Sequence, residues 1–313
     1  MKNIKFTCSW WSDSKKLTRR VLDQFFTESS DLFDYRIVHD DSYDIIVFFG
    51  YVSEPIKPTA NAYLFPQEPT WTGTHQKHFN GMPNLTVYGF DRTNYGGDCK
   101  FVETFAHMFY GGIGPDGEGW DDWKYNNIKN IAPKKTMNMC STISSRGDDW
   151  TSFSGGCMYQ HRCGLVRNIH HLDFIDFFGG WQLNGANIKS YALRKFDALL
   201  PYKFTLTVEN SNENYYVSEK FFDPILTNSI PIYFGCKNIK TLFPENGYIL
   251  LDNLTDHTKI VSQLNYINDN ADRLYGEMLP EALKIKRRYF NELNPLNKIL
   301  AHDSPSNTST QKL

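Results

Sequence analysis

The side chains best suited to chemistry are gathered in residues 202–235, where a polar loop separates two strand-like stretches. Ser218 stands where the N-cap of a helix is expected, directly before Glu219 and Lys220. A capped helix start presents free backbone N–H groups and a partial positive charge, which suit a phosphate group. Lys220 adds a full charge, and Glu219 can accept hydrogen bonds from the vicinal hydroxyls of a ribose or another sugar. The spacing therefore fits a phosphate and sugar site, and equally a capped crossover helix with a surface Glu-Lys pair.

Two other stretches match known motifs only in part. Cys157, His161 and Cys163 lie close together, but their spacing fits no standard zinc pattern, and the six cysteines are expected to be free thiols. Residues 112–117 match the GxGxxG pattern literally, yet no helical periodicity follows them. We therefore expect neither a metal site nor a dinucleotide site at these positions.

The elements that must position these side chains alternate between helix and buried strand. Residues 44–49 are nearly all apolar, as expected of a strand covered on both faces, and residues 15–26 place apolar side chains on one helical face. This alternation predicts an α/β fold built around largely parallel sheets. Strands are expected at residues 4–11, 35–39, 44–49, 62–65, 85–90, 137–142, 174–178, 204–208, 230–234 and 248–251, and helices at residues 15–26, 158–168, 190–199, 218–226, 259–268 and 281–293.

The regular pattern weakens between residues 96 and 136, which indicates an irregular region leading into an interdomain linker. We therefore expect an N-terminal domain at residues 1–135, a C-terminal domain at residues 136–300 and a flexible tail at residues 301–313. Two α/β domains of this kind usually bind ligands in the cleft between them, where the carboxyl ends of their strands meet.

Composition excludes several classes of protein. The 313 residues include 33 Lys and Arg and 35 Asp and Glu, so the net charge of −2 offers no general attraction for nucleic acid. The 41% hydrophobic and 22% charged residues are typical of a globular protein. No apolar run approaches the roughly 18 residues of a membrane span, and residues 1–6 lack the apolar stretch of a signal peptide. We expect a cytoplasmic or otherwise soluble protein with no nucleic-acid partner and no integral membrane segment.

Residues 202–235 closely resemble the donor-binding motif of the α1,3/α1,4-fucosyltransferases, glycosyltransferase family 10. The matching residues are Tyr202-Lys203-Phe204, Glu209-Asn210-Ser211, Tyr216-Val217-Ser218-Glu219-Lys220 and Ile230-Pro231-Ile232-Tyr233-Phe234-Gly235. Upstream, residues 172–179 are similar to the family's strand that ends in a VD.YG-like turn. The resemblance implies a GT-B fold, in which two Rossmann-like domains face a cleft. It also implies that the C-terminal domain holds GDP-fucose and the N-terminal domain an oligosaccharide acceptor.

The same resemblance assigns roles to individual residues of the donor site. The family residues that match Glu219 and Lys220 contact the sugar hydroxyls and the diphosphate of the donor, and those that match Asn210 and Tyr216 line the same pocket.

An arginine that pairs with the diphosphate precedes the VD.YG-like strand in the family. Arg162 is the best-placed match in this chain, and Arg167 is the alternative, because residues 144–156 depart from the family's usual spacing.

The implied reaction transfers L-fucose with inversion at its anomeric carbon, and such a displacement needs one base to take the proton of the acceptor hydroxyl. In the family this base is a glutamate in a short motif after an N-terminal strand, and Glu68 occupies that position here. A loop glutamate with no catalytic role would show the same sequence pattern. GDP leaves readily once its charge is met by cations, so no strong general acid is required. The chain contains no DxD triplet, so we expect no required metal cofactor, with stimulation by Mn²⁺ or Mg²⁺ still open.

The acceptor is the least defined part of the implied reaction. Trp10, Trp11 and Trp71 lie near the ends of N-terminal strands, where they either stack on sugar faces or pack in the core. The family default is an α1,3 linkage to a glycan that contains GlcNAc, glucose or galactose. An α1,2 linkage to galactose, a different GDP-sugar donor and a non-catalytic sugar-binding protein remain alternatives.

Overall fold

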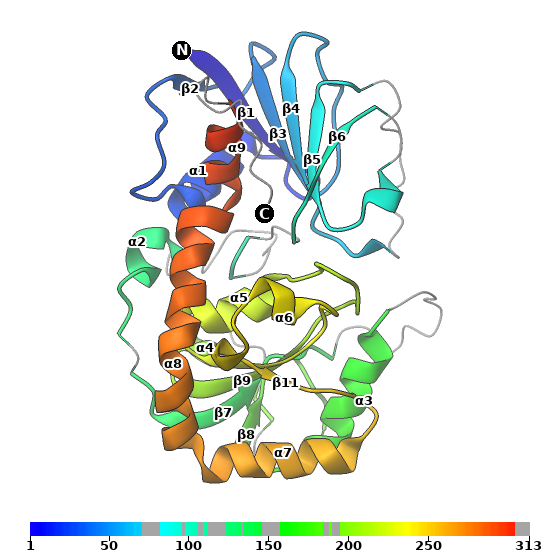
Figure 1. Ribbon diagram of the computed structural model, residues 1–313, viewed down its shortest axis with the longest axis vertical. Coiled ribbons are helices and arrows are strands. Elements are labelled where there is room, and N and C mark those ends of the chain that lie inside the picture. The colour runs from blue at the N-terminus through cyan, green and yellow to red at the C-terminus, as the bar shows by residue number, and fades with distance from the viewer. Residues whose placement is uncertain are drawn as a thin grey trace. The chain divides into compact units, whose positions relative to one another are not determined.

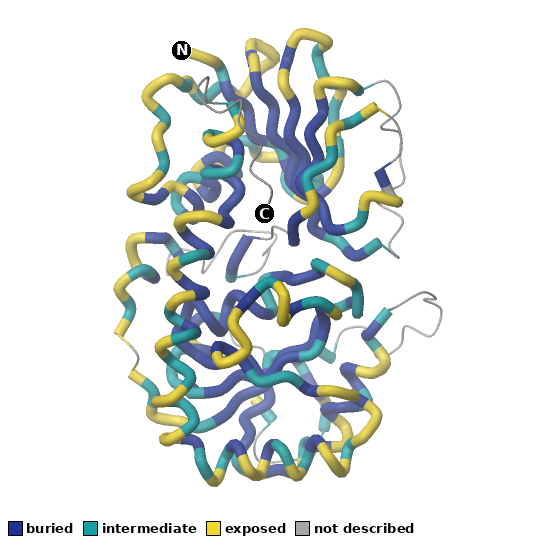
Figure 2. Tube along the Cα trace, viewed as in Figure 1, coloured by how far each residue is buried: buried dark blue, intermediate teal, exposed yellow. Residues whose placement is uncertain are grey.

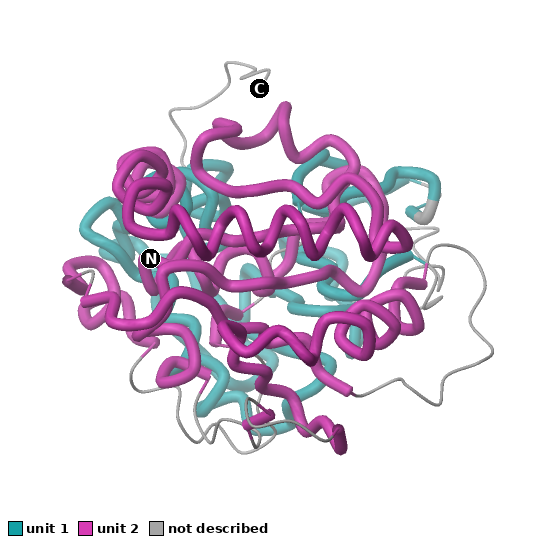
Figure 3. The backbone as a smooth tube through the Cα atoms, turned by 90° about the horizontal axis from the view of Figure 1, so that it is seen from below, with its two compact units in different colours: residues 1–107, 115–117, 287–313 teal, residues 108–114, 118–286 magenta. Residues whose placement is uncertain are grey.

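The chain divides into two compact units, shown in different colours in Figure 3. The first comprises residues 1–107, 115–117 and 287–313, and the second residues 108–114 and 118–286. The computed structural model describes residues 1–70, 82–95, 98–105, 109–111, 123–132, 134–145, 157–183, 188–189 and 195–303.

The first unit is built on a parallel sheet of six strands in the order β2-β1-β3-β4-β5-β6. Every residue of β3 is buried, as its apolar sequence predicts, and α1 begins at the N-cap Asp13 and packs against β1. Figure 1 shows α1 and α9 beside each other next to this sheet. The elements are β1 (Lys2–Cys8), α1 (Ser14–Phe25), β2 (Tyr35–Ile37), β3 (Ile45–Phe49), β4 (Asn61–Phe65), β5 (Leu85–Gly89), β6 (Lys100–Glu103) and α9 (Pro295–Asp303).

The second unit is built on a parallel sheet of five strands in the order β11-β10-β9-β7-β8. Its strands are mostly buried, and its helices expose their outer faces (Figure 2). The strands are β7 (Met137–Ser141), β8 (Ile175–Phe177), β9 (Tyr202–Val208), β10 (Ile230–Phe234) and β11 (Ile249–Leu250). The helices are α2 (Tyr125–Ile128), α3 (Tyr159–Ile169), α4 (Lys195–Leu199), α5 (Glu219–Leu226), α6 (Ile239–Leu242), α7 (His257–Asp269) and α8 (Ala271–Arg288).

Both sheets have the strand order of a doubly wound fold, so the α/β prediction is confirmed. The order reverses between β1 and β3 in the first sheet and between β7 and β9 in the second. In such sheets, ligands bind outside the carboxyl ends of the strands at the point of reversal. In the second unit the loop after β9 and the helix α3 that precedes β8 lie at this position.

The C-terminal part of the chain departs most from the sequence-based expectations. α8 begins at Ala271 rather than at residue 281, because the helix continues through Pro280, which a pattern analysis treats as a break. The units also differ from the expected domains 1–135 and 136–300, since residues 287–313 return to the first unit. The expected tail at residues 301–313 begins inside α9, which ends at Asp303, and residues 304–313 lie outside the described part of the chain.

One strand was missed within the stretch that was expected to be irregular. β6 pairs with β5 at the edge of the first sheet, but its four residues are only half-buried or exposed. So short an edge strand has no pronounced apolar alternation to mark it.

Lys135 fastens the start of the second sheet to two turns. Its ammonium group donates to the carbonyl oxygens of Leu200 and Thr227, both at 2.8 Å, and of Leu199 at 3.3 Å. Burial lowers the pKa of Lys135 to about 7, but its amino group donates hydrogen bonds in either protonation state. We expect Lys135→Met to lower the free energy of unfolding by about 2–4 kcal/mol, because these carbonyl groups lose their donor. Urea denaturation measures the change, and Lys134→Met, at the exposed neighbouring position, should stay within about 0.5 kcal/mol of the unsubstituted protein. Equal stability of the two variants would contradict this role.

None of the described helices has both the length and the apolar character needed to span a membrane.

Candidate functional site

The strongest candidate site lies at the start of α5, just beyond the carboxyl end of β9. Ser218 is its N-cap, as predicted, and its hydroxyl oxygen accepts from the backbone N–H of Lys220 at 3.3 Å. Glu219 and Lys220 are therefore the first two residues of the helix, where the free N–H groups and the helix dipole favour an anion.

Glu219 and Lys220 form an ion pair that is largely withdrawn from solvent. The Lys220 ammonium nitrogen lies 2.9 Å from Oε1 of Glu219, and the two side chains are 15% and 11% exposed. Burial opposes the charge on Glu219, but Lys220 and Lys195 outweigh it and hold the pKa of Glu219 at about 2. Burial likewise opposes the charge on Lys220, yet the carboxylates of Glu219 and Glu209 raise its pKa above the usual value. Both groups are thus charged near neutral pH although they are largely buried, whereas a surface Glu-Lys pair is exposed to water.

Arg162 approaches the same loop from the first turn of α3. It is 4% exposed, its Nη1 donates to Oδ1 of Asn210, and its guanidinium lies over the Tyr159 ring. The start of α3 is attached to the loop as well, since the N–H of Met158 donates to the carbonyl oxygen of Asn210 at 2.9 Å. The alternative, Arg167, is exposed near the end of α3. The structure therefore brings Arg162, and not Arg167, to Asn210.

Two buried polar atoms of this cluster have no hydrogen-bond partner among the described residues: Nε of Arg162 and Oε2 of Glu219. One is a charged donor and the other a charged acceptor, and leaving such groups buried and unpaired is costly. A ligand with both an anionic group and hydroxyl groups would satisfy the two. This is the chemistry of a sugar phosphate.

Tyr216 is 1% exposed and lies in the loop between β9 and α5. The preceding residue, Tyr215, adopts φ 59°, and its N–H donates to Oδ1 of Asn238 at 2.7 Å. The loop is thus held in a left-handed turn that places Tyr216 two residues before the helix cap.

A second ion pair, which was not predicted from the sequence, lies one turn further along α5. Lys195 lies 2.6 Å from Oδ2 of Asp223, which is fully buried, and the N–H of Gly111 donates to Oδ1 at 2.9 Å. The available signal was the spacing of Glu219 and Asp223, because residues four apart share one helix face. Lys195 lowers the pKa of Glu219, so this second pair is electrostatically part of the site.

The predicted base, Glu68, lies three residues beyond the end of β4 in the first unit and is partly exposed. Trp10 follows β1 at the same carboxyl edge of the sheet, is 44% exposed, and meets Tyr51 edge to face at 6.2 Å. Trp11 is half-buried. Trp71 and the glycine-rich stretch 112–117 lie outside the described residues.

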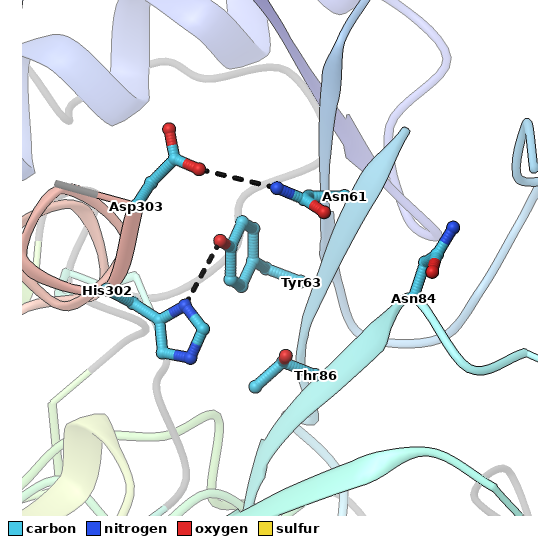
Figure 4. A pocket seen from close by; sticks show the side chains of 6 residues that line it. All are labelled: Asn61, Tyr63, Asn84, Thr86, His302 and Asp303. Carbon is cyan, nitrogen blue, oxygen red and sulfur yellow. Dashed lines mark hydrogen bonds between the residues drawn. The ribbon is translucent and has the colours of Figure 1, made fainter. Parts of the chain in front are cut away.

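The first unit also contains a polar cavity of about 160 Å³ (Figure 4). It is lined by Asn61, Tyr63, Asn84, Thr86, His302 and Asp303. Asp303 accepts from Lys2 at 2.9 Å and from Asn61 at 3.4 Å, and Nδ1 of His302 lies 3.3 Å from the Tyr63 hydroxyl. The cavity lies at the amino ends of β4 and β5, the opposite edge from the predicted base. Its polar contacts attach the end of α9 to the sheet.

Among the described residues, no group of three or more His, Cys, Asp and Glu side chains is arranged to hold a metal ion.

Comparison with known proteins shows a family similarity within the second unit. Residues 133–279 match the model of the glycosyltransferase family 10 (fucosyltransferase) C-terminal domain.

Several curated fucosyltransferases are similar to the chain over part of their length. It is 34% identical over 119 residues to alpha-(1,3)-fucosyltransferase B of Drosophila melanogaster, with 37% of this chain and 24% of that protein covered. It is 25% identical over 178 residues to the alpha-(1,3)-fucosyltransferase FucT of Helicobacter pylori, with 54% and 36% covered. GDP-fucose protein O-fucosyltransferase 3 of Homo sapiens is 31% identical over 83 residues, with 26% and 17% covered. The matches thus span well under half of each relative.

Solved structures show the same fold over nearly the whole chain. An alpha1,3-fucosyltransferase with GDP superposes with a TM-score of 0.54 at 14% identity, covering 96% of this chain and 88% of that one. The DNA-modifying enzyme β-glucosyltransferase gives a TM-score of 0.54 at 12% identity, covering 96% and 98%. These identities show the fold alone, which is the GT-B fold. The match of the family model concerns the C-terminal part of the chain: residues 133–279 are similar to the fucosyltransferase C-terminal domain of glycosyltransferase family 10.

Proposed function

We propose that this protein is an inverting fucosyltransferase, which transfers L-fucose from GDP-fucose to a hydroxyl group of a glycan, by the family default in α1,3 linkage. The observation that supports it most is the cluster of Arg162, Lys220 and the capped start of α5. In that cluster, two buried atoms, Nε of Arg162 and Oε2 of Glu219, have no hydrogen-bond partner in the part of the chain that the structure describes.

On the donor side, the cluster binds the diphosphate. The Lys220 ammonium, the Arg162 guanidinium and the first N–H groups of α5 neutralise the negative charge that grows on GDP as its bond to fucose breaks. Oε2 of Glu219 accepts a hydrogen bond from a hydroxyl of the fucose, while Oε1 stays on Lys220. Positive charge at the leaving group replaces a general acid.

On the acceptor side, Glu68 takes the proton from the hydroxyl that attacks the anomeric carbon. A single displacement, with attack from the face opposite GDP, inverts the configuration at this carbon. Trp10, exposed at the same edge of the sheet as Glu68, offers an aromatic face on which an acceptor sugar stacks.

A product assay tests the proposal. The chain is incubated with GDP-fucose and, separately, lactose, N-acetyllactosamine and free galactose, and the linkage of any product is read by NMR. We expect an α1,3-linked product. An α1,2 product on galactose would keep the class and change the linkage, and transfer only from another GDP-sugar would change the donor. Absence of both transfer and GDP binding would overturn the proposal.

We expect the reaction to proceed without a required metal ion, because the chain has no DxD triplet and two side-chain cations lie at the proposed diphosphate site. Treatment with EDTA should leave more than about half of the activity, with Mn²⁺ or Mg²⁺ stimulating it only moderately. The comparison is the initial rate with EDTA, with EDTA and excess Mn²⁺, and without additions. Complete loss of activity that Mn²⁺ restores would contradict this picture.

A further inference from the structure

Glu209 is a fully buried carboxylate that the proposed mechanism does not use. It directly follows β9, and its N–H continues the ladder by donating to the carbonyl oxygen of Phe234 at 2.9 Å. Three donors surround its carboxylate: the Ser218 N–H at 2.8 Å, the Ser218 hydroxyl at 2.5 Å and the Tyr233 hydroxyl at 3.2 Å. A buried carboxylate is costly unless it is hydrogen-bonded in this way.

The neighbouring backbone leaves space for this side chain. A Cβ atom at Gly235 would lie 2.3 Å from Cγ and 2.6 Å from Cβ of Glu209. Even alanine is therefore excluded at Gly235 unless Glu209 moves, so the glycine and the carboxylate fit together as a pair.

The contact between Glu209 and Ser218 orients the hydroxyl group that caps α5. Because the Ser218 hydroxyl donates its only proton to Glu209, its lone pairs face Lys220, accepting from the backbone N–H at 3.3 Å and lying 3.5 Å from the ammonium nitrogen. An amide at position 209 would instead donate to the same oxygen. The hydroxyl would then have to turn, and an acceptor at the start of α5 would be lost.

We propose that Glu209 is a positioning residue of the donor site, whose carboxylate fixes Ser218 and, through it, holds the start of α5 and Lys220 in place for the donor diphosphate. This inference rests on the proposed function, because it takes GDP as the ligand. Glu209 acts through Ser218 and contacts no substrate itself.

The direction in which Glu209→Gln changes the affinity for GDP distinguishes a positioning role from a purely electrostatic one. Glu209→Gln removes a negative charge close to an anion site, so a purely electrostatic role predicts tighter binding of GDP. A positioning role predicts weaker binding, and we expect the dissociation constant for GDP to rise about tenfold, as for the loss of one well-placed hydrogen bond. Isothermal titration calorimetry with GDP measures it, and the melting temperature is recorded on the same samples.

A double-mutant cycle with Ser218→Ala tests whether the effect passes through the cap. If it does, Glu209→Gln should add little to the loss that Ser218→Ala causes alone. Ser218→Ala also keeps the inference testable if Glu209→Gln does not fold, since this single change should then weaken GDP binding by a similar factor.

Asp176→Asn is the matched control. Asp176 is a buried carboxylate of the same unit, on β8, that accepts from the Tyr202 hydroxyl at 2.5 Å, and its loss should leave GDP affinity unchanged whatever it does to stability. Unchanged or tighter GDP binding in Glu209→Gln, or additive effects in the cycle, would overturn the positioning role. Failure of the unsubstituted protein to bind GDP would instead refute the proposed function.

Discussion

Lys220→Met should weaken GDP binding about 100-fold, because it removes the cation at the start of α5 while keeping most of the side-chain volume. Truncating one partner of a desolvated charge pair costs about 2–5 kcal/mol in binding, and each 1.4 kcal/mol is a factor of ten. Calorimetry with GDP measures the change. Lys240→Met is the matched control, since Lys240 is 57% exposed on α6 of the same unit and pairs with Glu245. Its GDP affinity should stay within about twofold of the unsubstituted protein.

A second variant separates the loss of the Lys220 ammonium from the effect of the buried Glu219 carboxylate that it leaves behind. In Lys220→Met, Glu219 stays buried and loses the cation that lowers its pKa most, so its pKa should rise from about 2 toward the ordinary value. The double variant Lys220→Met with Glu219→Gln removes both charges. If the ammonium contacts the diphosphate, the double variant binds GDP as weakly as the single one. Recovery of affinity in the double variant would show that the buried charge on Glu219 caused the loss.

The ionisation of Glu219 also defines the pH range over which the pair stabilises the fold. Its pKa is lowered in the folded chain, so its contribution is fully present above the unfolded value of about 4.5 and is lost only as the pH falls toward 2. Titration of Glu219 therefore leaves the site unchanged at neutral pH.

The local features of the proposed donor site were predictable because each has a signal in adjacent residues. The strand before Glu209, the cap at Ser218 and the positions of Glu219 and Lys220 all follow from residue order within one stretch, and the structure has them in that order. The capped crossover helix was the competing interpretation. What distinguishes the site from it is burial, which a sequence pattern does not encode.

The contacts between separate segments could not be predicted from the sequence pattern. Arg162 and Arg167 lie on one predicted helix, five residues and thus about 140° apart around its axis, so only packing decides which one faces Asn210. The Lys195–Asp223 pair joins two helices separated by β9, and the return of α9 to the first unit joins the two ends of the chain. Each depends on tertiary contacts without a local motif.

Glu68→Gln should reduce fucose transfer by about 10²–10⁴-fold, the usual contribution of a general base, and leave the dissociation constant for GDP unchanged. The amide keeps the size of the side chain but cannot take the proton of the acceptor hydroxyl, and GDP binding is assigned to the other unit. The measurements are kcat and KM for fucose transfer, with calorimetry on the same preparation. Glu103→Gln is the matched control, since Glu103 is an exposed glutamate at the carboxyl end of β6 in the same sheet, and its turnover should be unaffected. Retained turnover in Glu68→Gln would place the base elsewhere. A parallel loss of GDP affinity would instead mean that Glu68 supports the donor site.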